Sequence, residues 1–222
     1  MKDVIESCGV PHPEVNWILV EGAPADFSHV LRQDAAVDVY PVGMTTAASA
    51  AHALQHEHAN RFVADGHLGK LTRSLRLLGF DTAYHNEWDD ARLLDIMQTE
   101  QRALLTRDRR LLMHSIVQDG YCPRSDQPLE QTIEVIRRFH LADEFKPFTR
   151  CLHCNGQLHP VDKAAIVDQL EPLTRIHYDE FRMCADCRQI FWRGSHFAKL
   201  TALVERLRGD ANEGMSSSRP TY

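Results

Sequence analysis

The sequence predicts an α/β protein in which a small parallel sheet lies between a short α+β segment and a cysteine-rich segment. Three observations predict this class. Strand-like and helix-like runs alternate over residues 61–148, the pattern of a parallel sheet with helices on its faces. Two Cys-x-x-Cys pairs follow that stretch. The charge also changes: residues 1–59 hold 2 basic and 8 acidic side chains, whereas residues 60–150 hold 14 of each, which indicates a domain boundary near residue 60.

The composition is that of an ordinary globular protein. The chain has 222 residues, of which 43% are hydrophobic and 25% charged, and its net charge is −6. It is therefore neither disordered nor a uniformly basic nucleic-acid coat. It contains no apolar run of the roughly 18 residues that span a bilayer, and its first residues lack the apolar core of a signal peptide. We expect a cytoplasmic protein that does not bind membranes.

The first segment, residues 1–43, is expected to form a small α+β module. Asp3 to Ser7 has the pattern of a short helix, and Trp17–Val20 and Val37–Tyr40 have that of strands. Residues 44–60 are rich in Ala, Ser, Thr and His and are interpreted as a linker that is partly helical.

Two histidines of this linker, His52 and His56, have the i,i+4 spacing that presents two imidazoles to one metal ion. No third ligand accompanies them in the sequence. We interpret them as solvated side chains, since so short a motif is weak evidence for a metal site.

The central segment, residues 61–148, is expected to alternate three strands with four helices. Gly79 is placed to end the first helix, and Asp89 to cap the second. The predicted strands are Phe62–Ala64, Thr82–Tyr84 and Ala103–Thr106, and the helices carry Leu68, Leu71, Leu75 and Leu78, then Leu93 to Met97, then Leu111 to Ile116, then Leu129 to Phe139.

The four cysteines of the two pairs predict a structural zinc site. Cys151/Cys154 and Cys184/Cys187 are separated by 29 residues, and two such knuckles complete a tetrahedral Cys₄ site that leaves no position for water. Disulfides or a redox Cys-x-x-Cys are the alternatives, and both are disfavoured in a chain with no secretion signal and two matched pairs. The long spacer is expected to fold back as an inserted hairpin or helix.

The other two cysteines, Cys8 and Cys122, have no partner in the sequence. We expect both to be small buried hydrophobic side chains.

Two aspartates, Asp65 and Asp108, each follow a short apolar strand. Because the carboxyl ends of parallel strands meet at one edge of a sheet, where ligands bind, these carboxylates are expected to lie close together. Asp90 and Asp126 are candidates for the same edge. A hard divalent ion such as Mg²⁺ or Mn²⁺ would relieve their repulsion, and such ions commonly promote phosphodiester hydrolysis. The alternative is that each aspartate is an ordinary turn or N-cap residue.

Basic side chains accompany these carboxylates and are candidates for phosphate binding. The alternative is a solvated helix face. The residues are Lys70, Arg73 and Arg76 on the first helix, and Arg107 and Arg109 on either side of Asp108.

Several of these motifs, taken in order, resemble the Mut7-C ribonuclease family. The matching runs are FVADGHLGKLTRSLRLLGFDT, DDARLL, LLTRDRRLL, CLHC, CADC and FWRGSHF, over about residues 61–200. The resemblance implies a PIN-like nuclease domain at 61–148, followed by a zinc ribbon and C-terminal helix at 149–208. It also implies metal-dependent RNA cleavage, with Asp65, Asp90 and Asp108 as Mg²⁺ or Mn²⁺ ligands and Asp126 assisting.

The first segment resembles the ubiquitin-like, β-grasp domain that often precedes Mut7-C. It departs from that fold because a β-grasp begins with a strand hairpin, whereas this chain begins at the helix. We therefore expect a partial β-grasp that is poorly stable alone or is completed by a protein partner.

A non-catalytic adaptor is the competing hypothesis for function. In that case the zinc ribbon and the segment Trp192–His196 bind RNA or a protein, and the aspartates are turn residues. Beyond the ribbon, residues 209–222 have little to bury and are expected to be a disordered tail.

Overall fold

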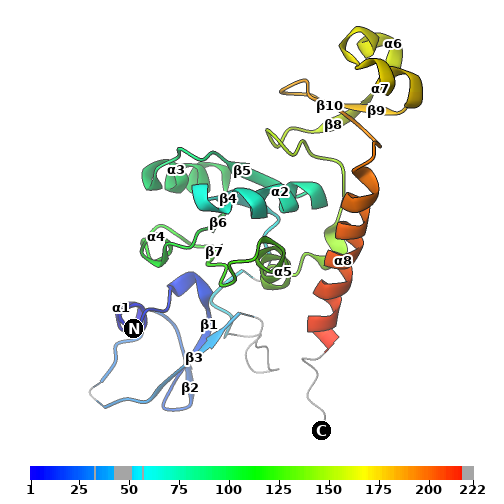
Figure 1. The fold of residues 1–222 in the computed structure, drawn as a ribbon. Coiled ribbons are helices and arrows are strands. Elements are labelled where there is room, and N and C mark those ends of the chain that lie inside the picture. The colour runs from blue at the N-terminus through cyan, green and yellow to red at the C-terminus, as the bar shows by residue number, and fades with distance from the viewer. Residues whose placement is uncertain (33, 43–51, 57, 217–222) are drawn as a thin grey trace.

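The computed structural model describes residues 1–32, 34–42, 52–56 and 58–216. A central α/β domain separates two smaller parts, which lie on opposite sides of it (Figure 1). The predicted linker at 44–60 falls largely outside the described residues. The two histidines interpreted as solvated, His52 and His56, are both exposed. His56 contacts Asp119 with a side chain 77% exposed, and His58 pairs with Glu144.

The N-terminal part packs a short helix on a three-stranded antiparallel sheet of order β2-β1-β3. Ile5 of the helix joins Val15, Ile18 and Val20 of the central strand in a small core. The predicted helix and two strands are confirmed, and the short β2 was not predicted. The elements are α1 (Lys2–Ser7), the 3-10 helix η1 (His12–Glu14), β1 (Val15–Val20), β2 (Ala23–Ala25) and β3 (Val37–Pro41).

The central domain is built on a four-stranded parallel sheet of order β5-β4-β6-β7. The three predicted strands and four predicted helices are present, while the two-residue β7 was not predicted. The strands are β4 (Arg61–Ala64), β5 (Asp81–Tyr84), β6 (Ala103–Leu105) and β7 (Gly120–Tyr121), and the helices are η3 (Gly66–Leu68), α2 (Gly69–Leu78), α3 (Asp90–Glu100), α4 (Arg109–Leu112), α5 (Pro128–Arg138) and η4 (Ala142–Glu144).

Side chains alternate across this sheet, so each face has its own core. Phe62 and Ala64 of β4 face α2 and α5, whereas Val63 faces α3 and α4. The leucines of α2 are fully buried against the first face, as their spacing predicts. Gly79 ends α2 with a φ of +100°, and the Lys146 carbonyl lies where a β-carbon would be, so glycine is required there.

The C-terminal part is a three-stranded antiparallel ribbon followed by a long helix that returns along the central domain (Figure 1). The spacer between the cysteine pairs folds back through helices inserted after the first ribbon strand, as predicted. The elements are β8 (Leu158–Val161), α6 (Lys163–Ile166), η5 (Val167–Gln169), α7 (Pro172–His177), β9 (Phe181–Cys184), β10 (Ile190–Trp192) and α8 (Phe197–Ser216).

The predicted start of a tail at residue 209 is wrong. Helix α8 continues to Ser216, and Ala211 is fully buried in the core beside α5. The sequence after Gly209 looks too polar to bury anything, but one small residue in the right turn of the helix is enough to continue the contact. Residues 217–222 lie outside the described part.

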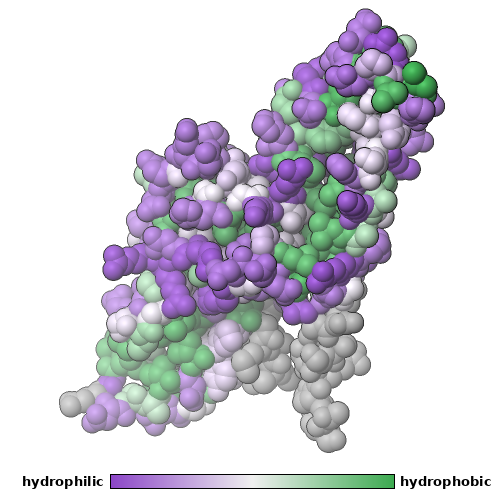
Figure 2. Space-filling view, viewed as in Figure 1, coloured by the Kyte–Doolittle hydropathy of each residue, from purple (hydrophilic) through white to green (hydrophobic). Residues whose placement is uncertain are grey.

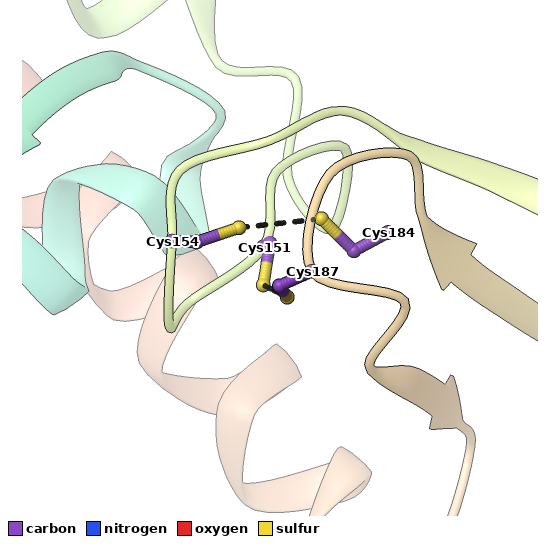
Figure 3. A group of neighbouring side chains, drawn as sticks. All are labelled: Cys151, Cys154, Cys184 and Cys187. Atoms are coloured by element: carbon purple, nitrogen blue, oxygen red, sulfur yellow. Dashed lines mark hydrogen bonds between the residues drawn. The ribbon is translucent and has the colours of Figure 1, made fainter.

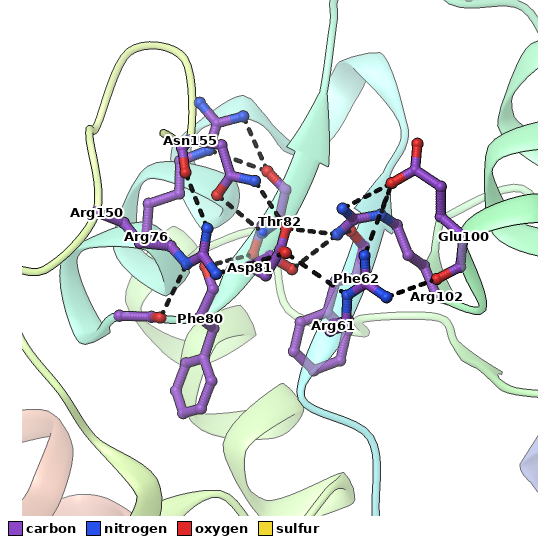
Figure 4. Close-up of polar contacts among 11 residues, drawn as sticks. Arg61, Phe62, Arg76, Phe80, Asp81, Thr82, Glu100, Arg102, Arg150 and Asn155 are labelled. Carbon is purple, nitrogen blue, oxygen red and sulfur yellow. Dashed lines mark hydrogen bonds and ion pairs between the residues drawn. The ribbon is translucent and has the colours of Figure 1, made fainter. Parts of the chain in front are cut away.

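A cluster of arginines around Asp81 joins the ribbon to the amino end of the parallel sheet (Figure 4). Asp81 begins β5, and its carboxylate contacts Arg102 at 2.6 Å and Arg150 at 3.4 Å. Asn155 of the ribbon donates a hydrogen bond to Asp81 and accepts one from the Thr82 N–H. The ribbon is therefore fixed to the sheet edge opposite to the one that carries Asp65 and Asp108.

Replacing Asp81 is expected to destabilise the protein and to change its response to acid. Burial alone would raise the pKa of Asp81, but hydrogen bonds from Arg102 and Asn155 and the charges of Arg102 and Arg150 keep that pKa below its ordinary value. Asp81→Asn removes the carboxylate that faces Arg150 and leaves Arg102 with Glu100 as its remaining countercharge, so we expect a loss of about 3 kcal/mol in unfolding free energy at pH 7.

The pH dependence has a defined sign. Because the pKa of Asp81 is lower in the folded than in the unfolded chain, its ionised carboxylate stabilises the fold at any pH above the unfolded-state pKa of about 4. This stabilisation is lost as the pH falls through the pKa that Asp81 has in the folded state. Chemical denaturation at pH 7 and pH 3 should therefore show a smaller acid-induced loss for Asp81→Asn than for the parent. Asp95→Asn, which breaks an exposed pair with Arg92, is the control and should change stability by less than about 1 kcal/mol. Equal acid sensitivity of parent and Asp81→Asn would contradict this role.

Candidate functional site

The four predicted zinc ligands converge at one end of the ribbon (Figure 3). Their sulfur atoms all lie within 4.8 Å of one another, with 3.6 Å between Cys151 and Cys187 and 3.4 Å between Cys154 and Cys184. A tetrahedral ion with Zn–S bonds of about 2.3 Å places sulfurs about 3.8 Å apart. The cysteines therefore fit one zinc ion.

The two cysteine pairs form matching turns. The N–H of Asn155 donates to the Cys151 carbonyl at 3.0 Å, and the N–H of Arg188 donates to the Cys184 carbonyl at 3.2 Å. Asn155 and Arg188, each directly after a pair, have φ of +74° and +61°. The two turns therefore have the same backbone shape, and each directs its two sulfur atoms toward the other turn. A shared ion requires this arrangement.

An ion would be needed to hold the Cys151 sulfur as a thiolate. Burial raises the pKa of the Cys151 thiol to about 12, so the unliganded cysteine is protonated at neutral pH. Zinc binding displaces such protons, which couples the metal to the folding of the ribbon. An ion held by all four sulfurs would have no open coordination position, so it would hold the fold rather than activate water.

The carboxyl edge of the parallel sheet carries the predicted acidic residues. Asp65 follows β4, and Thr106 and Asp108 follow β6, the strand beside it. The Thr106 hydroxyl donates to Asp65 Oδ2 at 2.8 Å and accepts from the Asp108 N–H at 3.0 Å. Thr106 is fully buried. Its hydroxyl thus links the Asp65 carboxylate to the Asp108 backbone through two hydrogen bonds.

These strands lie at the topological switch point of the sheet. The chain leaves β4 toward β5 on one side and then crosses to β6 on the other. Ligands of open α/β sheets bind in the crevice that such a reversal creates outside the carboxyl ends of the strands. Asp65 and Asp108 are therefore placed where a ligand is expected.

Asp90 and Asp126 are exposed, as Asp108 is, whereas Asp65 is half-buried. Asp89 caps α3 by accepting from the Arg92 N–H at 2.8 Å, and Asp90 is the exposed first residue of that helix. Asp126 has a side chain 79% exposed and contacts Arg107 at 2.5 Å. Asp108 also caps a helix, since its Oδ1 accepts from the Arg110 N–H at 2.7 Å.

The aspartates do not form a complete metal cage by themselves. Within the described ranges, the cysteine cluster is the one group of three or more potential ligands that reach a common ion. Mg²⁺ usually takes one or two carboxylates and completes its shell with water and substrate phosphate. A site of that kind needs no more carboxylates than Asp65 and Asp108 supply.

The predicted basic residues divide into exposed and buried members. Lys70, Arg73, Arg107 and Arg109 are exposed. Arg76 is only 3% exposed, and its guanidinium donates to the carbonyls of Thr82 and His153. The expectation that Arg76 contacts a phosphate is therefore wrong, because the ribbon covers it.

The predictions for the unpaired cysteines were half right. Cys122 is 5% exposed, as expected for a small core residue. Cys8 is exposed, because α1 ends before it and leaves its side chain outside the small N-terminal core.

One buried contact at this edge was not predicted at all. Glu14 of η1 is 7% exposed; its carboxylate accepts from the Cys122 N–H at 2.9 Å and contacts the Arg124 guanidinium at 2.5 Å. Cys122 directly follows β7, so the N-terminal part holds the start of the loop that leads to Asp126. No local pattern marks Glu14, since its partners lie more than a hundred residues away.

Removing this carboxylate is expected to destabilise the whole chain. Glu14→Ala leaves the Cys122 N–H without an acceptor and Arg124 without its countercharge, and we expect a loss of about 2 to 3 kcal/mol. Urea unfolding measures it. Glu130→Ala, at an exposed position on α5, should change stability by less than about 0.5 kcal/mol. If both variants unfolded at the same urea concentration, the contact would contribute nothing to the fold.

Two family profiles match the sequence of this chain. A sequence profile described as the Mut7-C RNAse domain matches residues 60–204, and one described as Mut7-C ubiquitin matches residues 1–46. Searches of curated proteins and of solved structures returned no match. None of the helices in the described part is both long and apolar enough to cross a membrane.

Proposed function

The chain belongs to the Mut7-C RNase family, and we propose that it hydrolyses RNA phosphodiester bonds at the carboxyl edge of its parallel sheet with Mg²⁺ or Mn²⁺ as cofactor. The observation that carries this proposal is the link from Asp65 through Thr106 to Asp108 at the switch point. A parallel sheet with acidic residues at this place also supports a PIN-like nuclease architecture.

The proposed ligands of the divalent ion are Asp65 and Asp108, with Asp90 from the neighbouring helix. Their oxygens are the hard donors that such ions prefer. When bound, the ion supplies a more acidic water and stabilises negative charge on the phosphate oxygens. Thr106 is buried and hydrogen-bonded on both sides, so it holds Asp65 in one orientation.

The exposed basic residues are proposed to hold the RNA backbone. Lys70 lies in the first turn of α2, close in sequence to Asp65, and Arg107 and Arg109 flank Asp108. Each cation that contacts a phosphate releases counterions and lowers the affinity of the complex at high salt. Asp126 pairs with Arg107, and we propose that it assists by orienting that guanidinium.

The ubiquitin-like segment is proposed to have two contacts. One is intramolecular, through Glu14. The other is a protein partner, because both outer strands of its sheet, β2 and β3, have one neighbour each among the described strands, and such edges pair readily with another chain.

A cytoplasmic location stays a prediction of the sequence.

The function is tested by incubating the purified, zinc-loaded protein with labelled single-stranded and structured RNA. Added Mg²⁺ or Mn²⁺ should give cleavage products, and DNA of the same sequence is the control for substrate class. A crystal soaked in Mn²⁺ should show density between Asp65 and Asp108. Divalent-independent cleavage, or Mn²⁺ bound elsewhere, would contradict the proposed site.

A further inference from the structure

A groove of about 880 Å³ lies where the zinc ribbon meets the central domain. Its walls come from α2, the first cysteine turn, α7 and the segment that joins β10 to α8. Figure 2 shows hydrophobic side chains at the surface where the ribbon meets the long helix. The volume lies within the range of pockets that hold small ligands.

The side chains of this groove suit a flat, anionic ligand. Arg73 provides a fixed positive charge, and none of the described residues that line the groove is acidic. Aromatic faces stack on unpaired bases of any sequence, and imidazole N–H groups donate hydrogen bonds. The aromatic residues are Tyr178, Phe191, Trp192 and Phe197, and the histidines are His153, His177 and His196.

The Trp192 ring is exposed, and neighbouring residues fix its position. It is 40% exposed, and its ring centroid lies 6.4 Å from that of Tyr178 and 6.5 Å from that of Phe181. A β-carbon at position 194 would lie 2.9 Å from the indole nitrogen, so Gly194 leaves room for the ring beside the turn. An aromatic side chain held in this way loses little rotational freedom when a base stacks on it.

Helix α2 connects this groove to the candidate active site. The helix begins just after Asp65 and ends at the ribbon, where Arg76 donates to the His153 carbonyl at 2.7 Å. Lys70 and Arg73 are exposed one turn apart along it, and Arg73 lines the groove. The 10 residues of α2 span about 15 Å, so a strand leaving the acidic edge needs several nucleotides to reach Trp192.

We infer that this groove binds a base of single-stranded RNA, stacked on Trp192, while Arg73 contacts the backbone that continues toward Asp65. The inference rests on the proposed ribonuclease function and adds to it a preference for substrates with an unpaired flank. A second pocket, of about 500 Å³, lies beside the same ribbon strands, but Asp179 and Glu180 line it. This pocket shares Trp192 with the groove, and it also holds Arg150, Arg182 and Arg193. Two of those arginines already face carboxylates, Arg193 with Glu180 and Arg150 with Asp81, whereas no acidic residue among the described residues lines the groove of Arg73, which favours that groove for a phosphate chain.

The test uses the full chain with Asp65→Asn and Asp108→Asn, zinc-loaded and without added divalent ion, so that bound RNA stays intact. Labelled oligouridylates from about 4 to about 16 nucleotides, the range of site sizes of single-strand binders, are titrated by fluorescence anisotropy. Trp192→Leu removes the aromatic face but keeps an apolar side chain, and Trp192→Phe restores a ring. Ile176→Ala, at a 70% exposed apolar position of α7, is the matched control.

Trp192→Leu is expected to weaken binding of the long oligomers at least about fivefold and to leave the shortest unchanged. Trp192→Phe and Ile176→Ala should bind like the parent. Arg73→Ala should reduce the slope of log affinity against log salt by about 0.7, the value for one phosphate of a single strand, whereas Trp192→Leu should not change that slope. Arg182→Ala, in the second pocket, controls for loss of charge.

A second readout follows Trp192 directly. In a Trp88→Phe background, long RNA should quench tryptophan fluorescence, and Trp192→Leu should abolish the quenching. Cleavage is measured in the chain with Asp65 and Asp108 intact. If that chain cleaves long RNA but Trp192→Leu binds long RNA as well as the parent does, the inference is wrong while the proposed function stands, and the groove belongs to another ligand such as a protein. If the parent neither binds nor cleaves RNA, both fail.

Discussion

Asp65→Asn combined with Asp108→Asn is expected to reduce the rate of RNA cleavage at least about 10³-fold, equivalent to about 4 kcal/mol of transition-state stabilisation. The change removes both charges that would hold a divalent ion at the switch point. It preserves shape: an amide oxygen at position 65 still accepts from Thr106, and asparagine caps a helix as well as the aspartate at 108 does. Initial cleavage rates at saturating Mn²⁺ measure the effect.

The fold must be shown to survive this change. Thermal unfolding of the double variant should match the parent within a few degrees, because no buried partner is lost. Asp89→Asn is the sharpest control: it lies next to Asp90, caps α3, and should retain full activity, whereas Asp90→Asn should lose part of it. Activity that survives in the folded double variant would remove the proposed mechanism and favour the non-catalytic adaptor.

The sheet, its helices and its acidic edge could be predicted because local patterns determine them. Phe62–Ala64 and Ala103–Leu105 are apolar runs that end at an aspartate or threonine, and the leucines of α2 repeat at helical spacing. Such patterns also place Asp65 and Asp108 at one edge, because parallel strands share a direction. The cysteine spacing is similarly local, and the four sulfurs converge as predicted.

The errors and omissions concern contacts between parts distant in sequence. The sequence predicts that Arg76 is one of three exposed cations on α2. The first cysteine turn covers Arg76 instead, and its His153 carbonyl accepts a hydrogen bond from the guanidinium. Glu14 has no pattern of its own, and its role appears only when η1 packs beside β7. The two-residue β7 is too short to give a periodicity. In each case the missing information is which surfaces meet, and local sequence does not contain it.

Removal of the zinc ion is expected to unfold the ribbon and to release it from the central domain. Structural zinc in small domains contributes on the order of 10 kcal/mol, more than the few small hydrophobic contacts around the cysteines contribute. Without the ion, the buried Cys151 and Cys184 lose their common partner, and the turn that presents Asn155 to Asp81 is no longer held. Cys184→Ser should have the same effect as chelation.

Limited proteolysis with mass spectrometry distinguishes local from global unfolding. In the chelated protein and in Cys184→Ser, new cuts should appear between residues 149 and 192, while the core around Phe62 and Leu104 stays protected, because its side chains pack within the central domain. Cys8→Ser, at an exposed cysteine outside the cluster, should keep its zinc and the parent pattern. A Cys184→Ser protein that retained one zinc per chain would show that Cys184 is not needed to hold the ion. A chelated, zinc-free protein with a protected ribbon would leave the coupling from zinc through Asn155 to the parallel sheet without a basis.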